Sequence, residues 1–314
     1  MLDNIIFSAN IVAPVFLIIA VGYFSNKVKI INEVFVYVTS KFVFQVSLPV
    51  FIFLQISKLD LTQVFDVNQI IFITTGTFIT YVLIWIGTIP LIKEPADKGA
   101  FIQGAFRGNY AIVGLALIKN LFGTDALGKA SLILAFLLPV YNILAVIVLV
   151  VPKHQGKINI KTILQEIIFN PLILAVIIAL PFSYWQIKIS EMFTVTGGYL
   201  AELALPLALI GIGGSLNLEN LKKASTLAFT SSIIKIVILP AVLTLIALLL
   251  GYRYDDLGIR FIAFACPTAI ASFVMADVMG ANSKLAGNII MITTLGSVFT
   301  ISLGILLLKS FNLI

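Results

Sequence analysis

Two short polar segments interrupt apolar stretches of this chain. They are Arg107-Gly108-Asn109-Tyr110 and Cys266-Pro267-Thr268. Proline lacks the N–H that a helix needs and glycine tolerates irregular backbone, so each segment predicts a break in a helix. The half-helix after a break presents free N–H groups and a partial positive charge, which favour a bound anion. We therefore predict an anion site where these breaks lie.

Polar side chains beside the breaks strengthen this prediction. Asn109 and Thr268 supply hydrogen-bonding groups, although each is also suited to cap its own half-helix. Arg107 can present its guanidinium to a carboxylate, or instead reach the membrane surface or pair with an acid. Asn142 needs a partner in hydrocarbon, either a ligand or a neighbouring helix. The candidate substrate-binding residues are Arg107, Gly108, Asn109, Tyr110, Asn142, Cys266, Pro267 and Thr268.

Four other residues are candidates for coupling or charge balance. Lys235 lies deep in an apolar stretch, where charges are costly and point to function. Glu202 stands 157 positions after Gln45, so one half of the chain carries a carboxyl where the other carries its amide. Glu202 is suited to carry a proton, and a structural pair with Lys235 or Lys41 explains it equally well.

The composition excludes several classes of protein. The chain has 314 residues, of which 60% are apolar and 11% charged, whereas soluble domains are about 25% charged. Its 20 basic and 14 acidic residues are scattered, which excludes a nucleic-acid-binding surface. One histidine, His154, and one cysteine exclude an internal disulfide and leave a zinc site without its usual ligands. With neither a Ser/His/Asp set nor an ATP-binding segment, we expect no enzyme and no cofactor.

Apolar stretches long enough to cross a bilayer fill almost the whole chain. A transmembrane helix needs roughly 20 mostly apolar residues. The sequence predicts an all-α multi-pass protein with ten such spans, at 5–24, 33–56, 68–91, 98–120, 127–151, 162–182, 192–216, 224–250, 258–279 and 284–308. Loop lysines and arginines are more numerous on the face reached after the first span, which predicts both termini outside.

Similar residues recur at a constant distance along the chain. Pro14 is followed by Pro171 and Pro49 by Pro206, each pair 157 positions apart. This offset predicts two repeats of five helices, at 1–156 and 157–314, and an odd number inverts the second copy. Inverted repeats with broken helices, here the fourth and ninth, are typical of secondary transporters. The glycine run 211–214 predicts close helix packing or a flexible joint.

These features resemble the auxin efflux carrier family over almost the entire chain. The residues that carry the resemblance are Pro14, Leu48-Pro49-Val50-Phe51, the stretch 109–123, Phe264-Ala265-Cys266-Pro267-Thr268 and the basic Lys235. Plant members usually have proline before the crossover asparagine, where this chain has Gly108, and many have a long central loop that is missing here. The chain is similar to a compact bacterial member.

The resemblance implies a fold and a function. It implies a scaffold of helices 1, 2, 6 and 7, a crossover domain of helices 3, 4, 5, 8, 9 and 10, elevator-type alternating access and a homodimer. It also implies a small organic anion as substrate, either an auxin-like indole acid or a dicarboxylate such as malate or malonate.

The sequence therefore predicts a secondary transporter for a small carboxylate in the cell membrane of a bacterium. Coupling to protons is favoured over coupling to Na⁺. A sodium-coupled symporter of the bile-acid or pantothenate type is the alternative, and it requires acidic oxygens around the breaks, where few acids lie. A channel is a further alternative, which currents far above carrier turnover would reveal.

Overall fold

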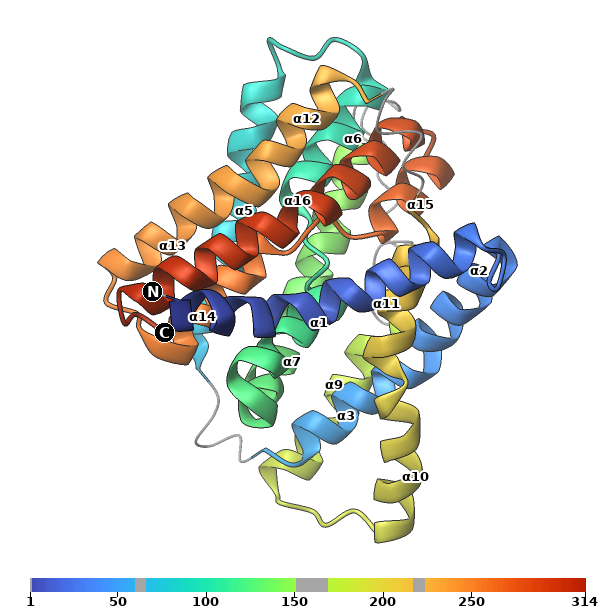
Figure 1. The fold of residues 1–314 in the computed structure, drawn as a ribbon, viewed down its shortest axis with the longest axis vertical. Helices are drawn as coiled ribbons and strands as arrows, with labels where there is room; N and C mark the ends of the chain where they lie inside the picture. Colours follow the sequence, from blue (N-terminus) through green and yellow to red (C-terminus); the bar gives the residue numbers. More distant parts are fainter. Residues whose placement is uncertain (1, 60–65, 151–168, 217–223) are drawn as a thin grey trace.

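The structure, a computed structural model, describes residues 2–59, 66–150, 169–216 and 224–314 (Figure 1). Within these ranges the chain is helical and contains no strand. His154, the predicted repeat boundary at 156/157 and the start of the sixth predicted span lie outside the described residues.

Seven helices in the described ranges are long and apolar enough to cross a membrane. They coincide with seven of the ten predicted spans, and they are Asp3–Lys27, Glu33–Ser57, Val67–Thr88, Ala126–Leu149, Glu191–Gly214, Thr226–Leu249 and Ser283–Ser310. The predicted spans at 98–120 and 258–279 are interrupted helices, and the span at 162–182 is described only in part. These helices identify the chain as a multi-pass membrane protein. The total of ten membrane spans stays a prediction.

Local sequence explains where several helices begin and bend. Asp66 accepts hydrogen bonds from the Asn68 and Gln69 backbone N–H groups at the start of α5 (Val67–Thr88). Asn170 caps α9 (Pro171–Tyr184) in the same way, with Pro171 at the first helical position, where its missing N–H costs nothing. Gly123, at φ 80° and ψ −164°, divides α7 (Leu115–Val150) into two helices, since glycine readily adopts positive φ.

One set of helices, which we call the α1 group, is linked by the contacts of α1 (Leu2–Lys27) with α11, of α11 with α2 and α10, and of α3 with α9 and α10. Its other members are α2 (Glu33–Phe42) with the π-helical η1 (Val43–Ser47), α3 (Leu48–Ser57), α9, α10 (Glu191–Glu202) and α11 (Ala204–Gly214). Helices α1 and α11 approach backbone to backbone, because a Cβ on Gly22 or Gly213 would collide with the other helix. The glycine run at 211–214 therefore serves close packing, as one of its two interpretations predicted.

The remaining helices form a second set, which we call the α16 group. Its members are α5, α6 (Pro95–Phe106), η2 (Tyr110–Gly114), α7, α12 (Thr226–Ile233), η4 (Ile234–Ile238), α13 (Leu239–Leu249), α14 (Tyr254–Ala265), α15 (Ala271–Val278) and α16 (Ser283–Ser310). The two groups touch where α1 lies along α16, beside the chain termini (Figure 1). There the Ser8 hydroxyl donates to the Ser302 carbonyl at 2.7 Å.

A buried cation joins two helices at one end of the α16 group. Arg260, on α14, is fully buried, and its guanidinium lies 3.5 Å from the centre of the Tyr252 ring. It pairs with Asp66 at 3.8 Å, so α14 is held to the start of α5. Burial and the neighbouring Asp255 raise the pKa of Asp256 at this end.

Candidate functional site

The two predicted helix breaks lie against each other. Helix α6 ends at Phe106 and η2 begins at Tyr110, while α14 ends at Ala265 and α15 begins at Ala271. Between these ends the extended segments form an antiparallel bridge from Gly108 to Thr268. We call this contact the crossing.

Backbone hydrogen bonds join the two segments at the crossing. The Asn109 N–H donates to the Pro267 carbonyl at 2.7 Å, and the Ala269 N–H donates to the Arg107 carbonyl at 3.2 Å. Buried backbone groups without partners are costly, so each broken helix satisfies groups that the break in the other leaves free. This pairing explains how irregular backbone is tolerated in the buried interior of the molecule.

Thr268 anchors the crossing to two further helices. Its N–H donates to the Thr293 hydroxyl oxygen of α16 at 3.1 Å, and its own hydroxyl donates to the Gly104 carbonyl of α6 at 2.7 Å. The N-cap of α15 is Ile270, which provides no side-chain bond. The alternative interpretation of Thr268 as the cap of its own half-helix was therefore wrong, because its hydroxyl is engaged with Gly104.

Asn109 and Tyr110 place uncommitted polar groups at the crossing. The Asn109 side chain does not cap η2 and forms no hydrogen bond with the described part of the chain, although the residue is only 6% exposed. Tyr110 is buried, and its hydroxyl likewise has no partner within the described ranges. The capping interpretation of Asn109 was therefore wrong, and both groups are able to bind a ligand.

Arg107 and Asn142, both predicted site residues, are in direct contact. The buried Arg107 guanidinium donates to the Asn142 side-chain oxygen at 2.9 Å and to the Met275 sulfur at 2.7 Å. Asn142 therefore has the neighbouring-helix partner that its place in hydrocarbon requires. Because Arg107 is 4% exposed, it does not extend to the membrane surface.

Lys235 places a second buried cation next to the crossing. It lies on η4, is fully buried, and its ammonium donates to the Phe264 carbonyl at 2.8 Å, near the end of α14. A Cβ added to Gly108 would lie 3.2 Å from this ammonium. Cys266 is a buried free thiol on the other segment of the crossing. Of the four coupling candidates, Lys235 is thus the one placed beside the predicted site.

Comparison with known proteins identifies the family of this chain. A family model described as membrane transport protein matches residues 7–305. The chain belongs to this family. It is the auxin efflux carrier family that the sequence motifs resemble.

Two relatives are similar to this chain over most of its length. An uncharacterized transporter of Methanocaldococcus jannaschii is 24% identical over 306 residues, which cover 94% of this chain and 96% of that protein. A protein named "Putative malonate transporter" from Rhizobium meliloti is 25% identical over 276 residues, 86% of each chain. The present protein is accordingly a membrane transporter and not an enzyme.

The other coupling candidates of this transporter lie away from the crossing. Lys41 and Gln45 are exposed on α2 and η1. Glu202 is exposed at the end of α10. Within the described part of the chain the ion pairs are Lys129 with Asp255 and Arg260 with Asp66, so the alternative interpretation of Glu202 as a structural partner of Lys235 or Lys41 was wrong.

Glu202 instead lines a cavity of about 380 Å³ between the two helix groups. The α1 group contributes Gln55, Lys58 and Glu202, and α7 of the α16 group contributes Lys119 and Asn120. Of these polar lining residues, only Glu202 was singled out from the sequence. A spacing of three to four residues places Ala116, Lys119 and Asn120 on one face of a helix, but that pattern does not reveal which helix it faces.

Proposed function

We propose that this transporter is a secondary carrier of a small organic anion, with a carboxylate bound at the crossing. The observation that carries the proposal is the pair of uncommitted groups, the Asn109 amide and the Tyr110 hydroxyl, beside the buried cations Arg107 and Lys235. A carboxylate needs hydrogen-bond donors and compensating positive charge when it leaves water. Cys266, Pro267 and Thr268 form the other segment of the crossing.

The proposed carrier works by movement of one helix group against the other. We assign helices 1, 2, 6 and 7 of a ten-helix inverted repeat to a scaffold, represented here by the α1 group, and the remaining helices to a moving crossover domain. The cavity lined by both groups supports this division, because it gives a substrate space between a fixed and a moving surface. The crossing moves as a unit in this scheme, since its backbone bonds lie within the α16 group.

We favour a dicarboxylate of the malonate or malate type over an auxin-like indole acid. The two buried cations, Arg107 and Lys235, can compensate the two negative charges of a dicarboxylate. In addition, one relative is named "Putative malonate transporter". We place the carrier in the bacterial plasma membrane with both termini outside and as a homodimer. Glu202 is the proposed proton carrier, because it lines the cavity that the substrate crosses.

Uptake of labelled malonate, malate and indole-3-acetate into proteoliposomes, each with and without a proton gradient, tests the proposal. We expect uptake of a dicarboxylate that Asn109→Ala reduces by about tenfold or more, the equivalent of about 1.4 kcal/mol of lost binding. Asn68→Ala at the exposed start of α5 is the matched control. Uptake by Asn109→Ala at the control rate, or uptake of none of the three anions, contradicts the proposal.

The same assay tests the coupling. Glu202→Gln should remove stimulation by the proton gradient while leaving exchange of substrate in place, because an amide does not carry a proton. Persistent stimulation in Glu202→Gln would exclude Glu202 as the proton carrier.

A further inference from the structure

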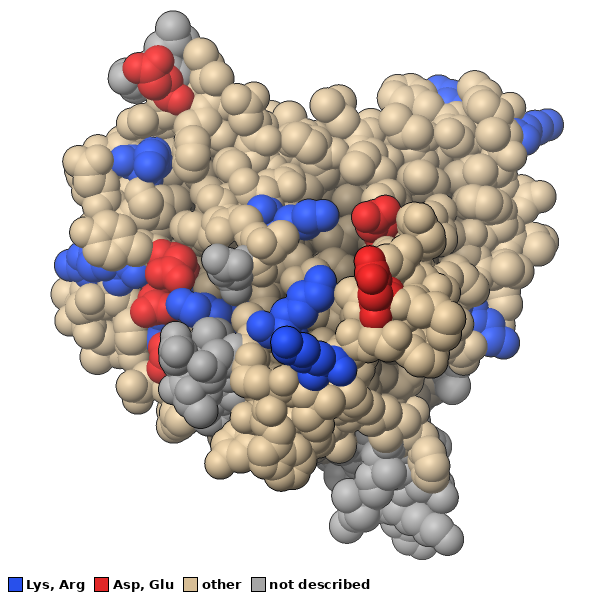
Figure 2. Space-filling view, turned by 90° about the horizontal axis from the view of Figure 1, so that it is seen from below, with Lys and Arg blue, Asp and Glu red and all other residues tan. Residues whose placement is uncertain are grey.

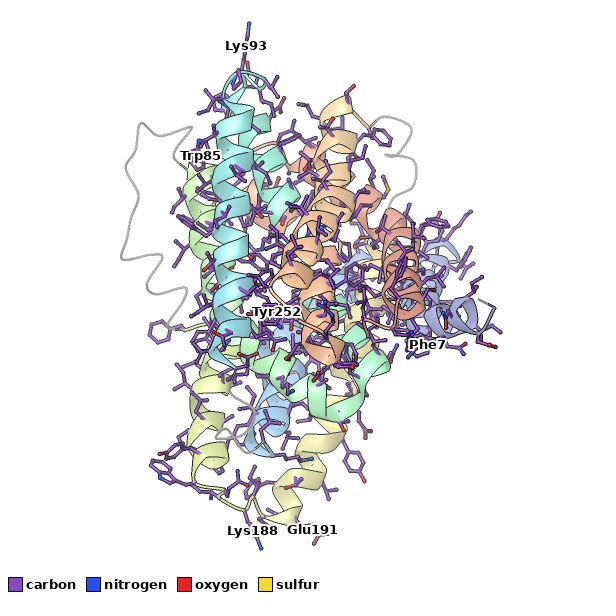
Figure 3. All side chains as sticks on the ribbon, turned by 90° about the vertical axis from the view of Figure 1, so that its left-hand side faces the viewer. Phe7, Trp85, Lys93, Lys188, Glu191 and Tyr252 are labelled. Carbon is purple, nitrogen blue, oxygen red and sulfur yellow. The ribbon has the colours of Figure 1, made fainter. Side chains whose placement is uncertain are left out.

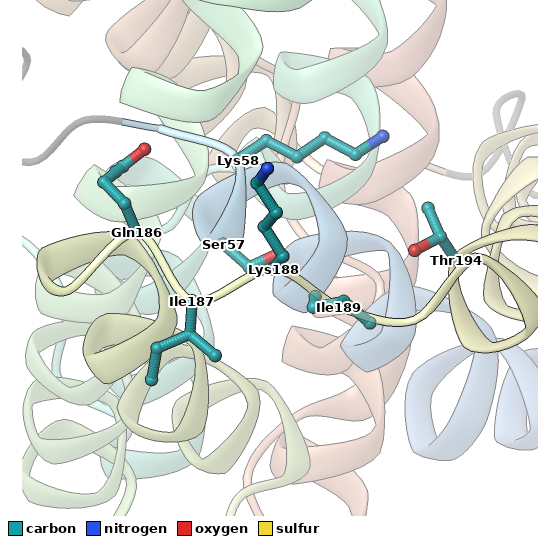
Figure 4. Close-up of a pocket in the computed structure, with 7 residues that line it drawn as sticks. All are labelled: Ser57, Lys58, Gln186, Ile187, Lys188, Ile189 and Thr194. Carbon is teal, nitrogen blue, oxygen red and sulfur yellow. The ribbon is translucent and has the colours of Figure 1, made fainter.

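A second cavity, of about 320 Å³, opens at the end of the molecule that carries α3 and α10 (Figure 4). It is lined by the end of α3, by the loop between α9 and α10 and by Thr194. Lys58 and Thr194 also line the 380 Å³ cavity between the helix groups. The two cavities therefore adjoin, and together they lead from the surface toward the space between the groups.

Two lysines on different elements share this outer cavity. Lys58 directly follows the last residue of α3. The Lys188 side chain lies beside it and comes from the loop between α9 and α10 (Figure 4). None of the described residues that line this outer cavity is acidic. Lys119 adds a third cation in the inner cavity, where Glu202 is the acid among the described lining residues. In Figure 2 several basic side chains lie near the centre of this face, with acidic side chains directly beside them.

Hydrogen bonds tie the loop that carries Lys188 to the end of α3 that carries Lys58. The Ser183 hydroxyl and the Gln186 side-chain amide both donate to the Leu59 carbonyl, at 2.6 and 2.9 Å. Gln186 adopts a positive φ of 51°, and the Ile187 N–H donates back to the Phe182 carbonyl at 2.9 Å. The backbone segments that carry Lys58 and Lys188 are thus fixed beside one another at this mouth.

We propose that Lys58 and Lys188 form a capture station for dicarboxylate dianions at the mouth of the transport pathway. The proposal rests on the proposed function, and it adds a site outside the crossing. Charges at the rim of a binding site mainly raise the rate of encounter, and a dianion is attracted about twice as strongly as a monoanion. Salt screens such exposed charges, since the Debye length falls from about 30 Å at 0.01 M to about 3 Å at 1 M.

Malonate uptake by the double variant Lys58→Gln/Lys188→Gln, measured against concentration at low and at high salt, tests the proposal. We expect the KM to rise about fivefold at about 20 mM salt and the difference to vanish near 0.5 M, with the maximal rate unchanged. The inhibition constant of monomethyl malonate, a monoanion, should rise only about twofold at low salt.

Lys93→Gln is the matched control, because Lys93 is exposed at the opposite end of the molecule (Figure 3). It removes one positive charge outside the proposed station and should leave the KM for malonate close to that of the wild type. An unchanged KM in the double variant, or a rise that persists at high salt, overturns the station. Equal effects on malonate and its monomethyl ester also overturn it.

The helix end offers a purely structural explanation of Lys58, because a cation there complements the C-terminal partial charge of α3. That role predicts a lower melting temperature in Lys58→Gln with a salt-independent KM, and such a result overturns the proposal. A wild-type protein that carries no dicarboxylate refutes the dicarboxylate preference of the proposed function and, with it, this station. A wild type that carries malonate while the double variant behaves identically refutes the station and leaves the function standing.

Discussion

At the scale of single residues, Lys235 is the group whose environment most constrains its role. Its ammonium is fully buried and has a single neutral hydrogen-bond partner among the described residues, the Phe264 carbonyl. Burial of a charge is costly, and no ion pair of Lys235 is found in the described part of the chain. A positive charge retained at such cost stabilises an anion nearby more strongly than it would in water.

Replacement of this charge should weaken substrate binding. Lys235→Met keeps most of the length of the side chain but removes the charge, so we expect the KM for a dicarboxylate to rise about tenfold, the equivalent of about 1.4 kcal/mol. Lys41→Met, which removes an exposed lysine of the α1 group, is the control and should leave the KM unchanged. Initial rates of malonate uptake measure both. A normal KM in Lys235→Met would show that its charge does not act on the substrate.

The candidate site was predictable at the positions where backbone chemistry is distinctive. Pro267 and Gly108 marked the breaks from the sequence, because their backbone properties do not depend on distant neighbours. The roles of side chains were harder to predict from the sequence. Capping was one of the two interpretations of Thr268, and its hydroxyl instead bonds Gly104, a contact across 164 positions that no local pattern encodes.

At the scale of elements, hydropathy predicts long helices well and their contacts poorly. Seven predicted spans coincide with apolar helices, since about 20 apolar residues form a signal that needs no partner. The close approach of α1 and α11 depends on Gly22 as well as on the glycine run near 213. From the sequence the run was singled out and Gly22 was not. An isolated glycine in a membrane helix is common, so its partner becomes visible only in the fold.

The glycine contact leads to a prediction on stability. Gly213→Ala should lower the melting temperature in detergent, because its new Cβ would collide with the Ile19 backbone of α1, and overpacking costs about 1–3 kcal/mol. Gly198→Ala is the control, since no atom lies within 4 Å of a Cβ at that position. That change should be neutral or stabilising by up to about 1 kcal/mol, because alanine favours a helix. Equal melting temperatures for the two variants would contradict the packing.

At the scale of the whole molecule, the proposed movement of one group against the other requires the cavity between them to change shape. Gln55 lines it from α3 and Asn120 from α7, so a cross-link between cysteines at these positions would join the two groups. The chain has a single cysteine, Cys266, which is buried, so the wild-type background suits thiol reagents.

Cross-linking Gln55→Cys to Asn120→Cys with a short bifunctional thiol reagent should therefore stop transport, with a loss of about tenfold or more that reductive release of the linker reverses. The pair Gln55→Cys and Thr194→Cys lines the same cavity within the α1 group, so its cross-link should leave transport intact. Malonate uptake before and after cross-linking distinguishes the two. Full transport with the first pair linked would show that substrate crosses without relative movement of the groups, as in a channel. Loss with both pairs would assign the effect to obstruction of the cavity, because a linker in either position occupies the same space.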